Sequence, residues 1–172
     1  MYTVKGPDAT AHELERIIHQ YQTDLLRLCY AYLHDTELAK DAVQDTFIKV
    51  YRGLSGYRQA ASEKTWITRI AINTCKDIRR SAWFRHEDRH VALDSLPEPA
   101  VPPSALDLSI TEAVMQLPAR LRETALLVWY QGLSLEEAAV VLGITRQAVG
   151  SRLNRCRRKL RAVMEGSDHD EA

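Results

Sequence analysis

The sequence contains few cysteines, no long apolar run and no excess charge of either sign. Its three cysteines, Cys29, Cys75 and Cys156, are far apart and form no C-x-x-C pair, which argues against a disulfide framework and against a cysteine zinc site. No run approaches the roughly 18 apolar residues of a membrane span, and the N-terminus lacks a basic segment followed by an apolar one. We therefore expect a cytoplasmic protein in a reducing compartment, with no membrane insertion, bound metal or cofactor.

A strand pattern is also missing, because apolar and polar residues nowhere alternate over the length of a strand. Apolar residues instead recur at steps of three and four, which is the spacing of one helix face. Contents of 45% apolar and 27% charged residues are ordinary for a globular protein, so disorder throughout is excluded. The sequence predicts an all-α fold with two small helical domains joined by a flexible linker.

The first helical domain is expected over residues 10–84. Apolar periodicity predicts a helix over residues 12–33 and a second over about 37–54, with Asp35 and Thr36 as N-cap candidates between them. The polar stretch SGYRQAASEK then predicts a surface loop. A third helix is expected to begin near Glu63, with Trp66 on its apolar face.

A linker is expected over residues 85–107, where the helical period is lost and four prolines make regular structure improbable. At its start, residues 86–90 spell H-E-x-x-H, which on a helix would place two zinc ligands one turn apart. No third ligand and no apolar cleft wall are evident nearby. We interpret this segment as surface, and a metallopeptidase site is the alternative.

The second helical domain is expected over residues 108–165, followed by an acidic tail over 166–172. Pro118 is suited to the first position of a helix that ends at Gly132 and whose apolar positions are Leu121, Ala125, Val128 and Trp129. A last helix is expected to bury one apolar face. That face consists of Val149, Leu153, Cys156, Leu160 and Val163.

Two short helices joined at Gly143 have the layout of a helix-turn-helix that reads duplex DNA. Ser134 and Glu137 predict a capping box for the first helix, and Thr145 predicts the cap of the second. The formal net charge of the chain is zero, yet residues 146–161 carry seven basic residues and no acid, and local charge governs contact with phosphates. The alternative is a helical hairpin whose arginines form a solvated face. The candidate DNA-contacting residues are Thr145, Arg146, Gln147, Gly150, Ser151, Arg152, Asn154 and Arg155.

The second predicted helix carries a polar stripe opposite its apolar face, with an isoleucine among the charges. Such a stripe is suited to docking onto a helix of a partner protein. A solvated face with one stray isoleucine is the alternative. The stripe consists of Asp41, Gln44, Asp45, Ile48 and Arg52.

The third predicted helix and the loop before it combine cations, amides and an aromatic ring. This mixture is typical of surfaces that bind single-stranded DNA, where an unstacked base can be stacked and hydrogen-bonded. Asp77 is expected to pair with Arg80 at the three-residue spacing rather than to contact DNA. The candidate residues are Tyr57, Arg58, Gln59, Ser62, Arg69, Asn73, Lys76 and Arg80.

Two parts of the sequence resemble one known family, the extracytoplasmic-function sigma factors, which are small two-domain members of the bacterial RNA polymerase sigma family. The family's C-terminal domain is resembled by Leu117, Pro118 and Arg122, followed by GLSLEEAAVVLGIT and VGSRLNRCRRKL. DAVQDTFIKVYR resembles its polymerase-docking helix and KTWITRIAINTCKDIRR its promoter-melting helix. The resemblance covers about residues 15–163. The chain departs from it at Ala148 and Gly150, where threonine and lysine are common, and after Tyr57, where Gly-Glu-Ser is common.

The resemblance implies a non-enzymatic function in promoter-specific transcription initiation. The docking stripe would bind the clamp helix of the largest polymerase subunits, and the partners on core polymerase would be the beta-prime clamp helix and the beta flap. The third helix and its loop would read and melt the minus-ten element, with the loop capturing a flipped base, while the helix-turn-helix would read the minus-thirty-five element. An anti-sigma factor, either soluble or in the membrane, would hold the protein inactive.

A conventional transcription regulator that binds duplex DNA as a dimer, without polymerase, is a second hypothesis. It accounts for the helix-turn-helix but gives no task to the docking stripe or to the third helix. Binding to core RNA polymerase distinguishes the two hypotheses.

Overall fold

The computed structural model describes residues 7–83 and 112–167, and all described regular structure is helical. The chain divides into two units, Met1–Leu96 and Pro97–Ala172, each described by itself. The predicted linker and the H-E-x-x-H segment lie outside the described residues. Within the described residues, the all-α expectation is confirmed, and no helix there is long and apolar enough to cross a membrane.

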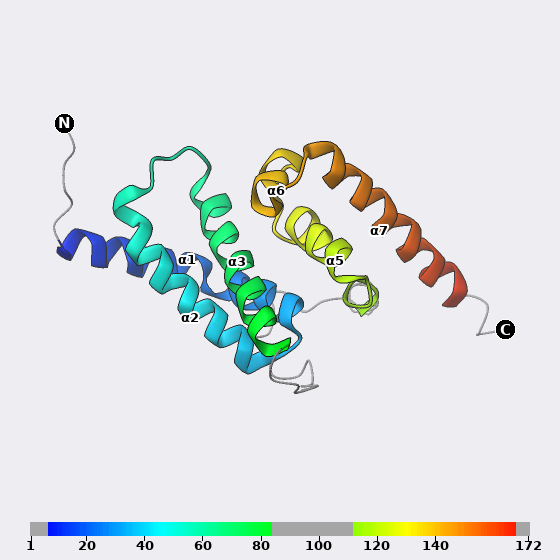
Figure 1. Cartoon of the computed structure of the whole chain (residues 1–172), viewed down its shortest axis with the longest axis horizontal. Helices are drawn as coiled ribbons and strands as arrows, with labels where there is room; N and C mark the ends of the chain where they lie inside the picture. Colours follow the sequence, from blue (N-terminus) through cyan, green and yellow to red (C-terminus); the bar gives the residue numbers. More distant parts are fainter. Residues whose placement is uncertain (1–6, 84–111, 168–172) are drawn as a thin grey trace. The chain divides into compact units, whose positions relative to one another are not determined.

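Three helices build the first unit (Figure 1): α1 (Pro7–Leu33), α2 (Thr36–Gly53) and α3 (Glu63–Trp83). A short 3-10 turn, η1 (Leu54–Gly56), extends α2. Each helix packs against the other two. The fully buried side chains at their centre include Ile17, Leu28, Val50, Ile67 and Ile72, with Cys29 and Cys75 beside them.

The predicted boundary between α1 and α2 is confirmed. His34 has a positive φ of 58° and donates its N–H to the Tyr30 carbonyl, which ends α1. Asp35 is the N-cap of α2, and its carboxylate accepts the Leu38 N–H at 2.8 Å. The cap therefore fixes where α2, which carries the polar stripe, begins.

Helices α2 and α3 bury several threonines, of which the predicted periodicity included Thr74 and missed Thr46, Thr65 and Thr68. Thr46 and Thr74 are less than 2% exposed, and their hydroxyls donate to the carbonyls of Ala42 and Ile70 one turn earlier, at 2.6 and 2.9 Å. A hydroxyl satisfied by its own helix can be buried at little cost. Trp66, expected in the core, is only half-buried.

The second unit contains a helical turn at residues 112–115, then α5 (Ala119–Ala125), α6 (Leu135–Leu142) and α7 (Arg146–Ser167). A single π-helical turn, η3 (Leu126–Tyr130), extends α5. Leu117, Leu121, Ala125 and Cys156 form a buried cluster, against which Leu160 packs.

Three expectations for this unit were wrong in detail. Pro118 precedes α5 as its N-cap instead of occupying its first position. Trp129 is 40% exposed because the π turn that contains it rotates it off the buried face. Val163 is 52% exposed, since the last turns of α7 extend past the buried cluster.

The predicted helix-turn-helix signals are confirmed. Ser134 and Glu137 form a reciprocal capping box at α6, and Gly143 ends α6 in the left-handed conformation, with φ 66°. Thr145 accepts the Ala148 N–H at 3.1 Å and so caps α7. These local contacts set the turn between α6 and α7.

Candidate functional site

The stripe on α2 is exposed along its whole length. All five predicted residues point away from the buried side of α2, where Ala39, Ala42 and Val50 are inaccessible to solvent. Ile48 is 43% exposed, and Tyr51 beside it, which sequence reasoning missed, is 45% exposed. Tyr51 lies three residues after Ile48, so the i+3 spacing was the available signal. The exposed residues of the stripe are Asp41, Gln44, Asp45, Ile48 and Arg52.

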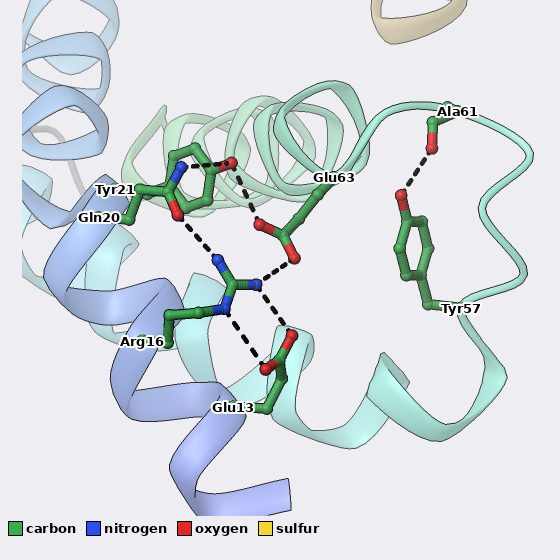
Figure 2. Close-up of polar contacts among 7 residues, drawn as sticks. All are labelled: Glu13, Arg16, Gln20, Tyr21, Tyr57, Ala61 and Glu63. Carbon is green, nitrogen blue, oxygen red and sulfur yellow. Dashed lines mark hydrogen bonds and ion pairs between the residues drawn. The ribbon is translucent and has the colours of Figure 1, made fainter.

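Tyr57 is held in place at the start of the loop between η1 and α3. Its ring stacks on Trp66 of α3, with centroids 4.6 Å apart and planes 21° from parallel. Its hydroxyl donates to the Ala61 carbonyl at 2.6 Å, across the loop (Figure 2). Burial raises the pKa of Tyr57, so the phenol stays a neutral donor. The ring is therefore a fixed wall of the loop.

A pocket of about 380 Å³ opens where α2, η1 and α3 meet. Two of its residues, Tyr57 and Asn73, were predicted site residues, and sequence reasoning missed the others. Periodicity could not find them, because they come from three separate segments. The lining residues are Lys49, Gly53, Gly56, Tyr57, Trp66, Ile70 and Asn73.

Lys49 and Gly53 each have a distinct place in this pocket. The Lys49 ammonium donates to the Thr74 hydroxyl at 3.0 Å and lies 3.8 Å from an Asp77 carboxylate oxygen, so α3 holds this cation at the rim. A Cβ on Gly53 would lie 3.0 Å from Cζ2 of Trp66, closer than side chains normally approach. Glycine at position 53 thus lets the Trp66 ring lie against α2.

A second hollow, of about 500 Å³, lies over the loop itself. Tyr57 lines this hollow as well as the first pocket, so the two share one residue. Ser62 at the end of the loop accepts the Thr65 N–H at 3.1 Å, which caps α3. The remaining lining residues are Gln59, Ala60, Ala61 and Glu63.

The outer face of α3 carries the predicted cations and amide next to this loop. Arg69, Asn73 and Arg80 are exposed, and Lys76 is half-buried. Arg80 lies 3.9 Å from Asp77, as the three-residue spacing predicted. Arg58 and Gln59 are exposed on the loop, and Gln59 adopts a positive φ of 57°.

In the second unit, the first two turns of α7 expose most of the predicted DNA-contacting residues. Arg146 forms an ion pair with Glu136 of α6, and Asn154 accepts a hydrogen bond from Arg157 at 3.0 Å. A Cβ on Gly150 would meet nothing within 4 Å, so the helix surface is open there. The exposed residues are Thr145, Arg146, Gln147, Ser151, Asn154 and Arg155.

Arg152 differs from its neighbours because it turns toward α5. Its guanidinium lies 3.4 Å from the Glu123 carboxylate, and the two side chains are 20% and 8% exposed. Arg157, which is exposed, lies over the Trp129 ring at 5.8 Å from its centroid. These contacts tie α7 to α5 and to η3.

No metal-binding cluster of three or more His, Cys, Asp or Glu side chains occurs within residues 7–83 and 112–167. The three cysteines are free thiols and buried, and burial raises the pKa of Cys156.

Two family models match the chain in the same order as its two units. A model described as Sigma-70 region 2 matches residues 17–85, and one described as Sigma-70, region 4 matches residues 113–162. The first match contains the α2 stripe and the pocket, and the second contains the helix-turn-helix.

Relatives match over nearly the whole chain. The RNA polymerase sigma-H factor of Pseudomonas aeruginosa is 30% identical over 94% of this chain and 90% of its own length. The ECF RNA polymerase sigma factor SigW of Bacillus subtilis is 30% identical over 84% of this chain and 85% of its own. The sigma factor RpoE in its complex with the anti-sigma factor NepR, from Bartonella quintana, has a TM-score of 0.76 at 20% identity, covering 89% of this chain and 97% of that one. This last likeness is one of fold.

Proposed function

The chain belongs to the extracytoplasmic-function group of the sigma-70 family, and we propose how its surfaces divide the work of this family. It directs promoter-specific transcription initiation and has no enzymatic activity of its own. The first unit binds core RNA polymerase and reads the minus-ten element. The second unit anchors the minus-thirty-five element as duplex. As domain bounds we propose residues 10–84 and 108–165.

The α2 stripe is the proposed docking site for core polymerase. An isoleucine and a tyrosine, each more than 40% exposed, lie among carboxylates, an amide and an arginine on one helix face. Interfaces combine apolar anchors with a polar rim in this way. By family resemblance the partner is the clamp helix of the beta-prime subunit, and Asp41, Gln44, Asp45, Ile48 and Arg52 are the contacts.

The pocket between α2, η1 and α3 is the proposed site for one base turned out of the minus-ten element. This pocket is the observation that carries the proposal. A stacked aromatic pair forms its wall, the Asn73 side chain offers hydrogen bonds, and Lys49 supplies positive charge at the rim. A captured base gains about 1–3 kcal/mol from aromatic stacking, which helps to offset its loss from the duplex.

The exposed cations next to the pocket are proposed to follow the backbone of the melted strand. Phosphate contacts fix register and orientation and leave sequence reading to the bases. Tyr57 acts as the pocket wall, and the other members of this surface contact the strand. They are Arg58, Gln59, Ser62, Arg69, Asn73, Lys76 and Arg80.

The start of α7 is the proposed reader of the minus-thirty-five element. Arg146 and Gln147 have the side chains that pair with guanine and adenine edges in the major groove. Thr145, Gly150, Ser151, Asn154 and Arg155 complete this surface. Arg152 is proposed to contribute through its pair with Glu123, which holds α7 at its angle to α5.

Control by an anti-sigma factor is also proposed, and the solved complex of RpoE with NepR supports it as a likeness of fold. An inhibitor that covers the α2 stripe and the face of α7 would block polymerase and DNA together. The inhibitor would also decide whether the protein is held at a membrane.

A reconstituted transcription assay tests the proposed function. Core RNA polymerase with this chain should transcribe from promoters that core alone ignores. A chain that binds duplex DNA as a dimer and never binds core would instead support the regulator hypothesis.

A further inference from the structure

A polar network joins α1 to the first residue of α3 (Figure 2). Arg16 donates to one oxygen of the Glu63 carboxylate at 2.5 Å, and the Tyr21 hydroxyl donates to the other at 3.1 Å. Both oxygens of Glu63 are therefore occupied by side chains of α1. Glu63 begins α3 and directly follows the loop of residues 57–62.

Arg16 is held in position before it reaches Glu63. Glu13, one turn earlier, accepts hydrogen bonds from Nη2 and Nε of Arg16 at 2.9 and 3.3 Å, and Gln20, one turn later, accepts one from Nη1 at 2.8 Å. The side-chain bonds to Glu13 and Glu63 raise the pKa of Arg16 further, so it remains a cation. A guanidinium already held by two neighbouring side chains loses little additional freedom when it binds a third group, here Glu63.

The loop is thus fixed at both of its ends. Tyr57 holds the first end through its stack on Trp66 and its bond to the Ala61 carbonyl. The network holds the second end, where Glu63 lines the hollow over the loop together with Gln59 and Ser62. An ordered loop has less conformational entropy to lose when a base binds.

We propose that Arg16 and Tyr21 are positioning residues for minus-ten recognition: through Glu63 they hold the 57–62 loop, and with it Tyr57 in the wall of the base pocket, in the conformation that captures a base. The inference rests on the proposed function, because the loop must be a DNA-reading element. It assigns to α1 a part in reading DNA through contacts with protein alone.

An ordinary surface ion pair is the competing explanation. Arg16 and Glu63 are 44% and 25% exposed, and pairs of this kind often add little to stability. That explanation predicts no effect confined to a single nucleotide. A direct contact between Arg16 and a phosphate predicts weaker binding whatever the base.

The test uses holoenzyme and single-stranded oligonucleotides of the non-template strand from a promoter that the holoenzyme selects. Each nucleotide is replaced in turn by an abasic one to find the position where wild type loses affinity. The variants Arg16→Gln, Tyr21→Phe and Glu63→Gln are then measured on the intact and the abasic oligonucleotide. Glu15→Gln, which removes an exposed carboxylate beside Arg16, is the matched control.

Arg16→Gln and Glu63→Gln should each bind the intact oligonucleotide about three- to tenfold more weakly, the range expected when a side chain and its loop must be ordered on binding. Tyr21→Phe should show a smaller loss, and Glu15→Gln none. The double variant Arg16→Gln with Glu63→Gln should be no weaker than either single one, because the two groups act as one unit. Affinity for core should not change.

On the abasic oligonucleotide, wild type and all variants should bind equally. Variants that stay weaker there, or that match wild type on the intact oligonucleotide, overturn the inference and leave the proposed function standing. If no abasic position weakens wild-type binding, the loop does not capture a base, and the proposed role of the loop fails with the inference.

Discussion

Gly53 determines how closely Trp66 approaches α2, and with it the shape of the pocket in which we propose that a base binds. Trp66 cannot readily move away, since Tyr57 stacks on its ring. We expect Gly53→Ala to displace the ring and to weaken holoenzyme binding to a single-stranded minus-ten oligonucleotide by about fivefold to tenfold, roughly the loss of one stacking contact. Fluorescence anisotropy measures this affinity.

Gly56 supplies the matched control for this prediction. It lines the same pocket, but a Cβ on it would meet nothing within 4 Å. Gly56→Ala should therefore keep wild-type affinity. Equal losses for both variants would contradict the role given to Gly53.

Gly150 lies in the interior of α7 with open space around it. Replacing a helical glycine by alanine removes backbone freedom from the unfolded chain, so Gly150→Ala should stabilise the second unit by about 0.5–1 kcal/mol. Hydrogen exchange of α7 amides in the full chain measures the change. Gly143→Ala, at φ 66°, should instead lower the same protection, and stabilisation by both substitutions would contradict the account.

Helix α7 is held against α5 by a pair of largely buried charges. Glu123→Gln removes the carboxylate charge that lies 3.4 Å from the Arg152 guanidinium. The largely buried Arg152 cation is then left without an opposite charge. We expect a loss of about 1–3 kcal/mol in the stability of the second unit, against less than about 0.5 kcal/mol for Glu136→Gln, whose pair with Arg146 is exposed. Hydrogen exchange in full-length variants compares the two, and equal effects would remove the positioning role of Glu123.

Helix α2 presents charge and apolar surface together on its exposed face. Asp45→Arg should weaken binding to core polymerase about tenfold or more, because reversing a charge within the proposed interface breaks electrostatic complementarity with the partner. Tyr51→Ala should weaken it as well, through loss of an apolar anchor. Glu15→Arg, an equally radical change on α1, should leave core affinity unchanged. Wild-type affinity in Asp45→Arg would show that core binds elsewhere.

The sequence predicted elements whose signals are local. Helix caps and turns depend on contacts within about four residues along the chain. The predicted ones are confirmed at Asp35, Ser134, Gly143 and Thr145. Periodicity likewise predicted the buried and exposed faces of α2. It failed at Trp129, because a π turn shifts the helical phase.

The base pocket and the α1 network could not be predicted in the same way. Lys49 and Trp66, or Arg16 and Glu63, are neighbours through packing of separate helices, and a single sequence carries no signal for such pairs. The resemblance implies that the third helix and its loop contact DNA. It does not single out Lys49, Gly53 or Tyr21, to which we assign a part in that contact.

At the scale of the whole molecule, the formal net charge of zero limits how strongly the free chain is attracted to DNA. Non-specific attraction to DNA depends on excess positive charge, and here it is confined to local surfaces. We therefore expect the free chain to bind promoter DNA at least about tenfold more weakly than the holoenzyme at physiological salt. Electrophoretic mobility shift with and without core measures the difference, and equal affinities would contradict this expectation.

The central claim is that this chain reads two promoter elements when it is bound to core RNA polymerase. The most direct test selects promoter sequences from randomised duplex DNA, with this chain in the presence and in the absence of core. With core, the account predicts enrichment of two separated elements, of which the downstream one becomes reactive to single-strand probes. Loss of the downstream element should follow from Asn73→Ala, and loss of the upstream element from Arg146→Ala. A single element enriched equally without core, or no binding to core, would contradict the claim.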